Sequence, residues 1–400
     1  MSDRFYRIPI QRLYNWIINE EKEGRIFGLY KEFFYTPKKD DPFRIKRFGR
    51  LLETPIGVAA GPQSQLAQNI IASWLCGARF IELKTVQTLD EIEVTKPCID
   101  MEDEGYNCEW SQELKVHDSF DEYLNAWIII HLLKHKFGWD TKEAGFIFNL
   151  SVGYDLAGIL KPNVQWFFDK MNDCRKEKDE KIVTLEKLYP PINEINIPDQ
   201  ISDNITLSTM HGCPSDEIEK IGKYLIEERK LHTAIKLNPT LLGPESVRNI
   251  LNEKLGYEIT VPDEAFEHDL KYEDAVSMIT SLRKSASENG VDFALKLTNT
   301  LESLNSTNWL PKNEKMVYTS GRALHPISIN LAAKLQNDFN GELDLSFCAG
   351  VDVFNVSDTI RCGLSPVTVC SDLLKPGGYL RLTQYLEEIE KLIRTNNASD

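Results

Sequence analysis

Two lysines lie at the ends of short apolar runs in this 400-residue sequence, and they are the first residues to indicate chemistry. Lys84 ends one run and Lys236 another, and a buried ammonium group needs an anionic partner. A flavin would supply one, because its reduced ring is negative at N1 and O2 and its side chain carries a phosphate. The other run ends are small or polar and include Ala60, Gly61, Thr85, Asn149, Asn238, Thr298, Asn299, Ala349, Gly350 and Ser371.

The apolar runs recur with a spacing that indicates alternating strands and helices. Each of eight candidate strands is followed by a helix-like segment, which favours a closed (βα)8 TIM barrel over an open doubly wound α/β sheet. The active site of such a barrel lies at the C-terminal ends of its strands, where the polar residues occur. The candidate strands are 56–60, 79–84, 146–150, 205–208, 234–237, 293–297, 343–347 and 366–370, and the helices include 65–75, 121–136, 215–229, 272–289 and 326–339.

An N-terminal extension and three long connections lie outside this alternation. Residues 1–50 precede the barrel, which we expect to occupy 51–395, and the run 43–48 followed by Gly49 predicts a hairpin that closes the barrel floor. The first long connection follows the second strand and predicts a lid, whereas the second is typical of a solvated excursion without chemistry. The three long connections are 88–119, 175–204 and 240–268.

The composition argues against nucleic acid and membrane partners. The formal net charge is −15 and the pI is about 5.1, so the chain repels phosphates and anionic lipids. No apolar stretch approaches the roughly 20 residues of a membrane-spanning helix, and the N-terminus is too charged for a secretory signal, so we expect a cytoplasmic location. Neither Cys-x-x-Cys nor Gly-x-Gly-x-x-Gly occurs, so iron–sulfur, structural zinc and Rossmann-type dinucleotide sites are not indicated.

Several segments occur in the order and spacing of dihydroorotate dehydrogenase-like FMN barrels. They are 54–62 (TPIGVAAGP), 82–86 (ELKTV), 236–239 (KLNP), 298–300 (TNT) and 320–326 (SGRALHP). With 208–214 (STMHGCP), the chain also resembles the N-terminal barrel of YgfK-type selenate reductase subunits. The resemblance implies an FMN-binding TIM barrel of the dihydroorotate or dihydropyrimidine dehydrogenase type. It also implies an electron-donor module or subunit that carries FAD and iron–sulfur clusters.

The same resemblance implies a role for each strand end. Lys84 would lie against flavin N1 and O2, and Lys236 would be a second cation near the ring or ribityl chain. Asn149 and Asn299 would hydrogen-bond the flavin or the substrate, and Cys213 would move a proton to or from the substrate carbon. Ala60 and Gly61 would pack on the ring, and Thr85 and Thr298 would also bind the cofactor. The phosphate would be lined by Ser320, Gly321, Ala349, Gly350 and Ser371.

Other residues have both a functional and an ordinary interpretation. Thr206 and Ala349 depart from the family pattern, which has asparagine and glycine at these positions. His211 lies in the same loop as Cys213 and is a second candidate for proton transfer, whereas a buried cysteine is most often inert. His131 and His135 are spaced like a metal-binding pair, but no third ligand is evident, so we interpret them as one helix face and expect no metal. The acidic run Asp100, Glu102, Asp103 and Glu104 predicts a solvated loop.

These residues predict an FMN-dependent oxidoreductase that reduces, or oxidises, a C=C or C=N bond of a small, cyclic nitrogenous compound. Cys213 or His211 would transfer the proton while Lys84 stabilises the anionic reduced ring. In one alternative, the flavin only relays electrons within a larger complex or the chain is an assembly subunit. In another, a flavin-free aldolase-type barrel uses Lys236 or Lys296 as a Schiff-base amine.

Overall fold

Eight parallel strands close on themselves in a computed structural model that describes residues 5–90, 95–101, 104, 106–108, 112–139, 143–208, 211–306 and 309–395. The barrel strands are β5 (Ile56–Val58), β6 (Phe80–Glu82), β9 (Ile147–Val152), β10 (Asn204–Ser208), β11 (His232–Leu237), β12 (Phe293–Leu297), β15 (Leu345–Phe347) and β16 (Val367–Val369). Each is hydrogen-bonded to the next, and β16 pairs with β5. The strands coincide with the eight apolar runs, so the predicted (βα)8 barrel is confirmed.

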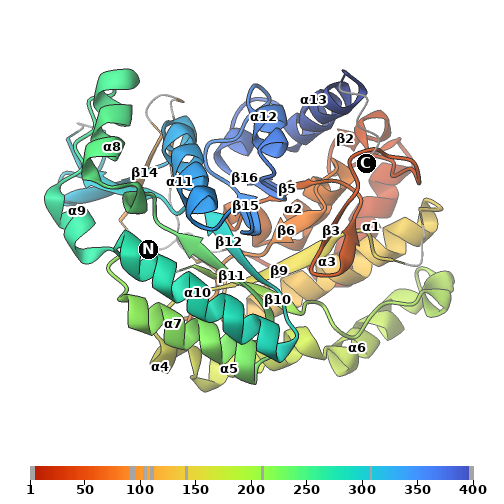
Figure 1. Ribbon diagram of the computed structural model, residues 1–400. Coiled ribbons are helices and arrows are strands. Elements are labelled where there is room, and N and C mark those ends of the chain that lie inside the picture. The colour runs from red at the N-terminus through yellow and green to blue at the C-terminus, as the bar shows by residue number, and fades with distance from the viewer. Residues whose placement is uncertain are drawn as a thin grey trace.

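Helices cover the outside of the strands. They are α1 (Ile10–Glu21), α2 (Ala67–Leu75), α3 (Val116–Lys136), α4 (Leu156–Ile159), α5 (Pro162–Asn172), α6 (Arg175–Glu186), α7 (Ser215–Lys223), α8 (Pro244–Arg248), α9 (Asp263–His268), α10 (Tyr272–Asn289), α11 (Leu324–Asp338), α12 (Val356–Arg361) and α13 (Arg381–Thr395). In α10, which lies beside α7 (Figure 1), the buried residues Ala275, Ile279 and Leu282 recur at helical spacing and form one apolar face. Within the described ranges, no helix is both long and apolar enough to cross a membrane.

A hairpin closes the N-terminal end of the barrel. It consists of β3 (Ile45–Arg47) and β4 (Arg50–Leu52), and its turn residues Phe48 and Gly49 have φ values of 50° and 69°, as a two-residue type I′ turn requires. The Phe48 side chain is buried together with Leu52, Phe80, Ile147, Ala234 and Ala294, most of which lie at the beginnings of barrel strands. The structure therefore contains the floor hairpin that the sequence predicts. A smaller hairpin in the N-terminal extension pairs β1 (Arg25–Ile26) with β2 (Leu29–Tyr30).

A four-stranded sheet that we did not predict joins two connections at the C-terminal end of the barrel. Its strands are, in spatial order, β13 (Leu301–Leu304), β14 (Met316–Thr319), β7 (Ile99–Met101) and β8 (Tyr106–Cys108). β7 and β8 lie in the connection after β6, whereas β13 and β14 follow β12, which is four strands away around the barrel. Because β14 pairs with β7, the sheet connects opposite sides of the barrel mouth.

Part of the acidic run is buried in or beside this sheet. Asp100 lies in β7 and is 7% exposed, and the side chain of Glu104 is 2% exposed. Glu102 and Asp103 lie outside the described residues. The prediction of a solvated loop is therefore wrong for Asp100 and Glu104, because strand pairing covers the first and two cations surround the second.

A buried ion pair crosses the barrel below its C-terminal end. Glu82 of β6 and Lys296 of β12 have side chains that are 1% and 2% exposed, and they form an ion pair. The carboxylate of Glu82 also accepts hydrogen bonds from the Thr368 hydroxyl of β16, at 2.9 Å, and from the backbone N–H of Ala60, at 3.2 Å. One carboxylate therefore connects β6 with β12, with β16 and with the turn that follows β5.

A second buried carboxylate lies between two helices of the outer layer. Glu122 of α3 is fully buried and accepts a hydrogen bond of 2.7 Å from the backbone N–H of Ala67, the first residue of α2. Burial raises the pKa of Glu122 to about 7, although the hydrogen bond from Ala67 opposes this shift. At neutral pH this carboxyl group therefore titrates inside the folded protein.

We expect that removing one member of the Glu82–Lys296 pair destabilises the barrel and that removing both restores most of the loss. Lys296→Met leaves a buried carboxylate without its cation, which typically costs about 3–5 kcal/mol, whereas Glu82→Leu/Lys296→Met buries no charge. Urea unfolding of the three proteins measures these differences. Lys284→Met, on an exposed part of α10, is the control and should change little. A loss in the double variant that is as large as that in Lys296→Met would contradict the prediction, and a larger loss would show that the two substitutions act independently.

Glu122 should make the stability of the protein decrease between about pH 4.5 and pH 7. In this range the folded state binds more protons than the unfolded state, so the free energy of unfolding falls as the pH rises, by up to about 3 kcal/mol. Glu122→Gln should flatten this part of the profile. The measurement is urea unfolding at several pH values for both proteins, and parallel profiles would contradict the assignment.

Candidate active site

Lys84 and Lys236 lie at the same end of the barrel. Lys84 lies two residues after the end of β6 and is 7% exposed, and Lys236 is half-buried near the end of β11. Both charges act on the thiol of Cys370, which follows β16. Burial raises the pKa of this thiol, whereas a hydrogen bond with Gln63 and the charges of Lys84 and Lys236 lower it. Both lysines therefore lie at the C-terminal ends of barrel strands, within electrostatic reach of one thiol.

Lys296, the other lysine considered as a Schiff-base amine, is held by Glu82 inside the barrel. Its amine is therefore already engaged in the ion pair that connects the strands. A Schiff base at this position would leave the Glu82 carboxylate buried without that cation, so the arrangement argues against Lys296 as a nucleophile.

The amide of Asn149 is fully buried within the barrel. Its Nδ2 donates to Oδ1 of Asn204 at 2.8 Å, and its Oδ1 accepts from the hydroxyl of Thr206 at 2.7 Å. Thr206 occupies the position where the family pattern has asparagine, and here it serves as a hydrogen-bond donor to Asn149. An amide has two N–H groups and two acceptor lone pairs, so Asn149 keeps capacity for a further partner.

A second amide pair lies at the ends of β11 and β12. Asn299 Nδ2 donates to Asn238 Oδ1 at 2.7 Å, and the Ser208 hydroxyl at the end of β10 contacts Asn299 Oδ1 at 3.4 Å. The predicted residue Thr298 is oriented differently, because its hydroxyl is hydrogen-bonded to Ser328 of α11 at 2.8 Å. Its side chain therefore joins the barrel wall to a helix.

The turn after β5 makes close contacts with the end of β16. A Cβ atom at Gly61 would lie 2.8 Å from Cys370 Sγ and 2.8 Å from Gln63 Oε1, so the space admits only glycine. Gln63, which we did not predict, donates to the backbone carbonyl of Cys370 at 3.0 Å. Thr85 contacts Ser151 through their hydroxyl groups at 2.7 Å.

The turns predicted to hold a phosphate meet each other. Gly321 and Gly350 both have positive φ, 78° and 57°, and a Cβ atom at Gly350 would lie 2.4 Å from the carbonyl oxygen of Gly321. Ser320 donates its backbone N–H to Asp100 in β7, so this group is engaged in the sheet. Ala349 accepts a hydrogen bond from His325 through its carbonyl at 3.0 Å. Ser371 begins the short 3-10 turn after β16.

Two cations beside these turns were not predicted. Arg322 Nε and Lys375 Nζ lie 3.3 Å and 3.1 Å from Oε1 of Glu104. The carboxylate of Glu104 is in turn within 3.4 Å of the position that a Gly321 Cβ would occupy. An anion therefore already lies between the two cations and the glycine turn. Arg322 belongs to the segment 320–326, so its proximity to the turn could have been read from the sequence, whereas that of Lys375 could not.

The loop after β10 contains both candidates for proton transfer. His211 Nδ1 lies 3.2 Å from Oδ2 of Asp269, and its ring stacks on Tyr318 of β14 with a centroid distance of 5.7 Å. Cys213 packs against the hydrophobic core, and burial raises the pKa of its thiol to about 11, helped by nearby carboxylates. Thr209 and Met210, which belong to the same segment, lie outside the described residues. Asp269 was not predicted, because nothing in the long connection marks it.

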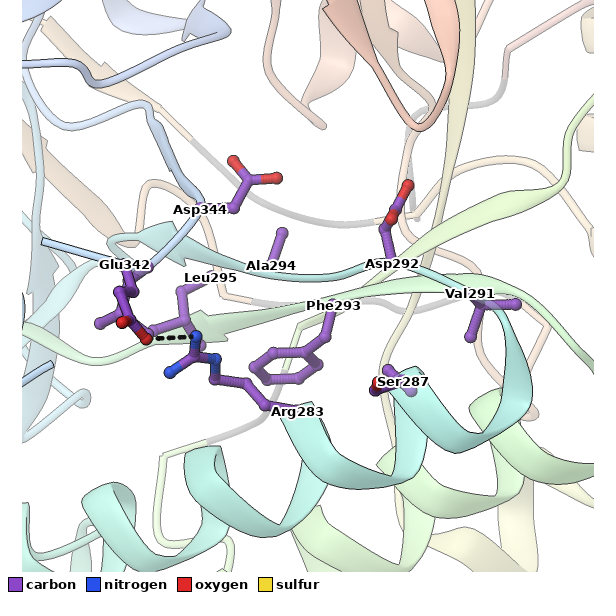
Figure 2. Close-up of a pocket in the computed structure, with 11 residues that line it drawn as sticks. Arg283, Ser287, Val291, Asp292, Phe293, Ala294, Leu295, Glu342 and Asp344 are labelled. Atoms are coloured by element: carbon purple, nitrogen blue, oxygen red, sulfur yellow. Dashed lines mark hydrogen bonds and ion pairs between the residues drawn. The ribbon is translucent and has the colours of Figure 1, made fainter.

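The grooves found elsewhere on the molecule do not belong to this site. Figure 2 shows one of about 290 Å³, in which Arg283 of α10 is ion-paired with Glu342 near the beginnings of β12 and β15. It therefore lies at the opposite end of the barrel from the lysines. Another, of about 500 Å³, lies beside α1 and α6 and includes Arg7 and Asp121.

The histidines of α3 have separate environments. His131 packs edge-to-face against Trp127 with a centroid distance of 4.6 Å, and burial lowers its pKa to about 3. His135 Nδ1 lies 2.9 Å from the hydroxyl of Tyr189. Among the residues that the structure describes, no group of three or more potential metal ligands occurs.

Comparison with known proteins identifies relatives over nearly the whole chain. The chain is 44% identical over 411 aligned positions to the YgfK proteins of Escherichia coli strain K12 and Escherichia coli O157:H7, which are described as oxidoreductases. The match covers 98% of this chain but 39% of each relative, so the chain spans about two fifths of their length.

Solved structures share the fold at low sequence identity. A ligand-free DHODH from Eimeria tenella is 14% identical, with a TM-score of 0.53 and 91% of both chains covered. The DHODH of the same organism in complex with ferulenol is also 14% identical, with a TM-score of 0.51 and 99% of this chain and 94% of that chain covered. Residues 27–399 match the model of a family described as the N-terminal TIM-barrel domain of the oxidoreductase YgfK. This chain therefore belongs to the family of YgfK N-terminal TIM-barrel oxidoreductase domains.

Proposed function

We propose that this domain binds FMN at the C-terminal ends of its strands and is a flavin-dependent oxidoreductase of the dihydroorotate or dihydropyrimidine dehydrogenase type. It would reduce, or in reverse oxidise, a C=C or C=N bond of a small, cyclic nitrogenous compound, within a selenate reductase-like system. The observation that carries the proposal is that Lys84 and Lys236 both lie at the C-terminal ends of strands of the closed barrel, where both charges act on the Cys370 thiol.

The residues at the barrel mouth fit the ring of the cofactor. When bound, FMN would supply or accept a hydride. Lys84 and Lys236 offer positive charge to a ring that becomes anionic on reduction, and such charge stabilises the reduced form. Ala60 and Gly61 carry little side-chain bulk, which would let a flat ring approach the backbone of this turn.

The residues after β14 and β15 fit the phosphate. Gly321 and Gly350 form two adjoining turns with little side-chain bulk, of the kind that binds phosphate through backbone N–H groups. Arg322 and Lys375 add charge-assisted donors and already contact a carboxylate, that of Glu104. A phosphate would replace Glu104 in these contacts.

The amide side chains are suited to a cyclic nitrogenous substrate. Asn299, Asn238 and Asn149 each present an N–H donor next to a carbonyl acceptor, which complements the N–H and C=O groups of a lactam-like ring. The hydroxyl of Ser208 contributes to the same polar region. This chemistry favours such a ring over an oxyanion as the substrate.

The loop after β10 would supply the proton. Cys213 and His211 are both candidates, and the contacts favour His211. Burial and neighbouring carboxylates raise the pKa of Cys213, which makes its thiolate less accessible at neutral pH. His211 is instead oriented by a carboxylate, an arrangement found around catalytic imidazoles.

The electrons would come from a separate module or subunit that carries FAD and iron–sulfur clusters. This sequence contains neither a Cys-x-x-Cys pair nor a Gly-x-Gly-x-x-Gly motif, and the YgfK relatives that it matches are more than twice as long. The barrel would then pass electrons between that module and the substrate.

The native protein should show the absorbance of oxidised flavin and release FMN on denaturation. Lys84→Gln should reduce flavin occupancy about tenfold or lower the two-electron reduction potential by about 30 mV, because it removes the cation that opposes charge at N1. A redox titration with dithionite measures the potential, and Lys284→Gln on the exposed face of α10 is the control. A colourless protein would contradict the proposal, and an unaltered potential and occupancy would contradict the role of Lys84.

His211→Gln should slow only the substrate half-reaction, and Cys213→Ala should slow it less. The expected loss for the main proton donor is about 10²- to 10⁴-fold, while flavin binding and reduction by dithionite stay normal because neither needs that proton. The measurement is anaerobic reoxidation of the reduced protein by pyrimidines, purines and selenate. If Cys213→Ala slows reoxidation and His211→Gln does not, the two roles are exchanged.

A further inference from the structure

Asp269 is a buried carboxylate that gathers three hydrogen-bond donors. It follows α9 in the connection between β11 and β12, and it is 4% exposed. Its partners are His211 Nδ1 at 3.2 Å, the Gly212 backbone N–H at 2.9 Å and the Thr240 hydroxyl at 2.7 Å. Burial raises the pKa of Asp269, but these donors outweigh it and hold the pKa below its usual value. Asp269 is therefore an ionised group at neutral pH.

The contacts of His211 fix the orientation of its ring. Nδ1 faces Asp269, and the ring plane lies at 23° to that of Tyr318. The other nitrogen, Nε2, is buried and has no hydrogen-bond partner among the residues that the structure describes. An unsatisfied buried nitrogen costs free energy, so a fold that retains one leaves it available for a ligand.

The position of this loop connects His211 to the predicted site. Ser208, three residues earlier, ends β10 and contacts Asn299 of the amide pair. Tyr318 belongs to the sheet that crosses the barrel mouth. The imidazole therefore lies against that sheet, in the loop after β10 and at the same end of the barrel as Asn299.

We propose that Asp269 is a positioning residue that holds His211 with Nδ1–H on the carboxylate and presents Nε2 to the substrate, so that His211 is the proton-transfer residue of the reaction. This inference rests on the proposed function. In the reducing direction, bound FMN would supply a hydride to one atom of the double bond, and Nε2–H of the imidazolium would give its proton to the other atom. The neutral imidazole keeps its Nδ1–H and takes a new Nε2 proton from solvent. Oxidation of the substrate follows the reverse path.

The charged groups around His211 make Asp269 the dominant partner. His268 of α9 lies beside Gly212 and is paired with Glu302 of β13 at 2.9 Å. Glu302 is therefore paired with His268, whereas Asp269 contacts His211 directly. Tyr318 is held neutral by burial and by carboxylates such as Glu302, which raise its pKa. Cys213, two residues beyond His211, contributes no charge at neutral pH because its pKa is raised as well.

Asp269→Asn removes the charge of the carboxylate with little change of shape. The asparagine oxygen can still accept from the Gly212 N–H, while its NH2 group faces Thr240 and His211 Nδ1 and can only donate to them. Glu302→Gln removes the same charge from the neighbouring histidine–carboxylate pair and is the matched control. In spectra of ¹⁵N-histidine-labelled protein, His211 should carry its proton on Nδ1 in the wild type and in Glu302→Gln. In Asp269→Asn, the form with the proton on Nε2 should become populated. The ¹⁵N signals of His211 are identified as those that disappear from the spectrum of His211→Gln.

The substrate half-reaction gives the second readout. Asp269→Asn should lower the maximal rate of anaerobic reoxidation by uracil, orotate or another active probe about 10²-fold or more, with the half-saturating concentration unchanged, because the carboxylate stabilises the imidazolium rather than the bound substrate. Glu302→Gln should react at nearly the wild-type rate. Equal loss in both variants, or a loss confined to the half-saturating concentration, would overturn the proposal.

Failure of this inference can be distinguished from failure of the proposed function. If the wild-type protein holds no flavin, or no probe reoxidises it, the proposed function fails before any variant is compared. The histidine spectra on the same samples still decide whether Asp269 sets the protonation of His211. An unchanged proton position in Asp269→Asn would overturn the inference even if the flavin chemistry holds.

Discussion

The barrel depends on one buried carboxylate, that of Glu82, which carries its charge in the middle of the hydrophobic core. Such a charge is tolerated because Lys296 neutralises it and because Thr368 and the backbone of Ala60 occupy its other acceptor positions. The pair spans the barrel from β6 to β12. The sheet formed by β13, β14, β7 and β8 spans the mouth between the connections of the same two strands. Lys84 follows β6 and Asn299 follows β12, so both residues lie along the chain between the buried ion pair and the four-stranded sheet.

The fold could be predicted from the sequence where the signal is local. The eight barrel strands are apolar runs bounded by turn residues, and the floor hairpin is marked by Gly49. The four-stranded sheet could not be predicted, because its strands are only three or four residues long and its two local strand pairs are joined by the pairing of β14 with β7, about 200 residues apart in the sequence. Glu82 and Lys296 illustrate the same limit. A single charged residue in an apolar run appears unfavourable, and only the tertiary pairing of the two explains why both are there.

The candidate site was predictable to the extent that it lies at strand ends. Lys84 and Lys236 could be placed because parallel strands of a barrel end on one side. Asp269 and Lys375 could not, because their partners are brought to them by loops whose paths have no periodic signature. The net charge of −15 is also a poor guide to this region, where cations are concentrated. The negative charge of the chain describes its surface as a whole, and the sign of the site is set by the few residues that the strands direct inward.

The pairing of β7 with β14 also has an evolutionary consequence. These strands belong to connections that leave the barrel on opposite sides, yet they share main-chain hydrogen bonds such as that between Tyr318 and the Cys98 carbonyl. Insertions in ordinary βα loops are inherited independently, because each loop folds back on its own helix. Here a change of length in one connection shifts the register of the other. A length change in either connection is therefore tolerated only if it preserves this pairing, so each connection constrains what the other can become.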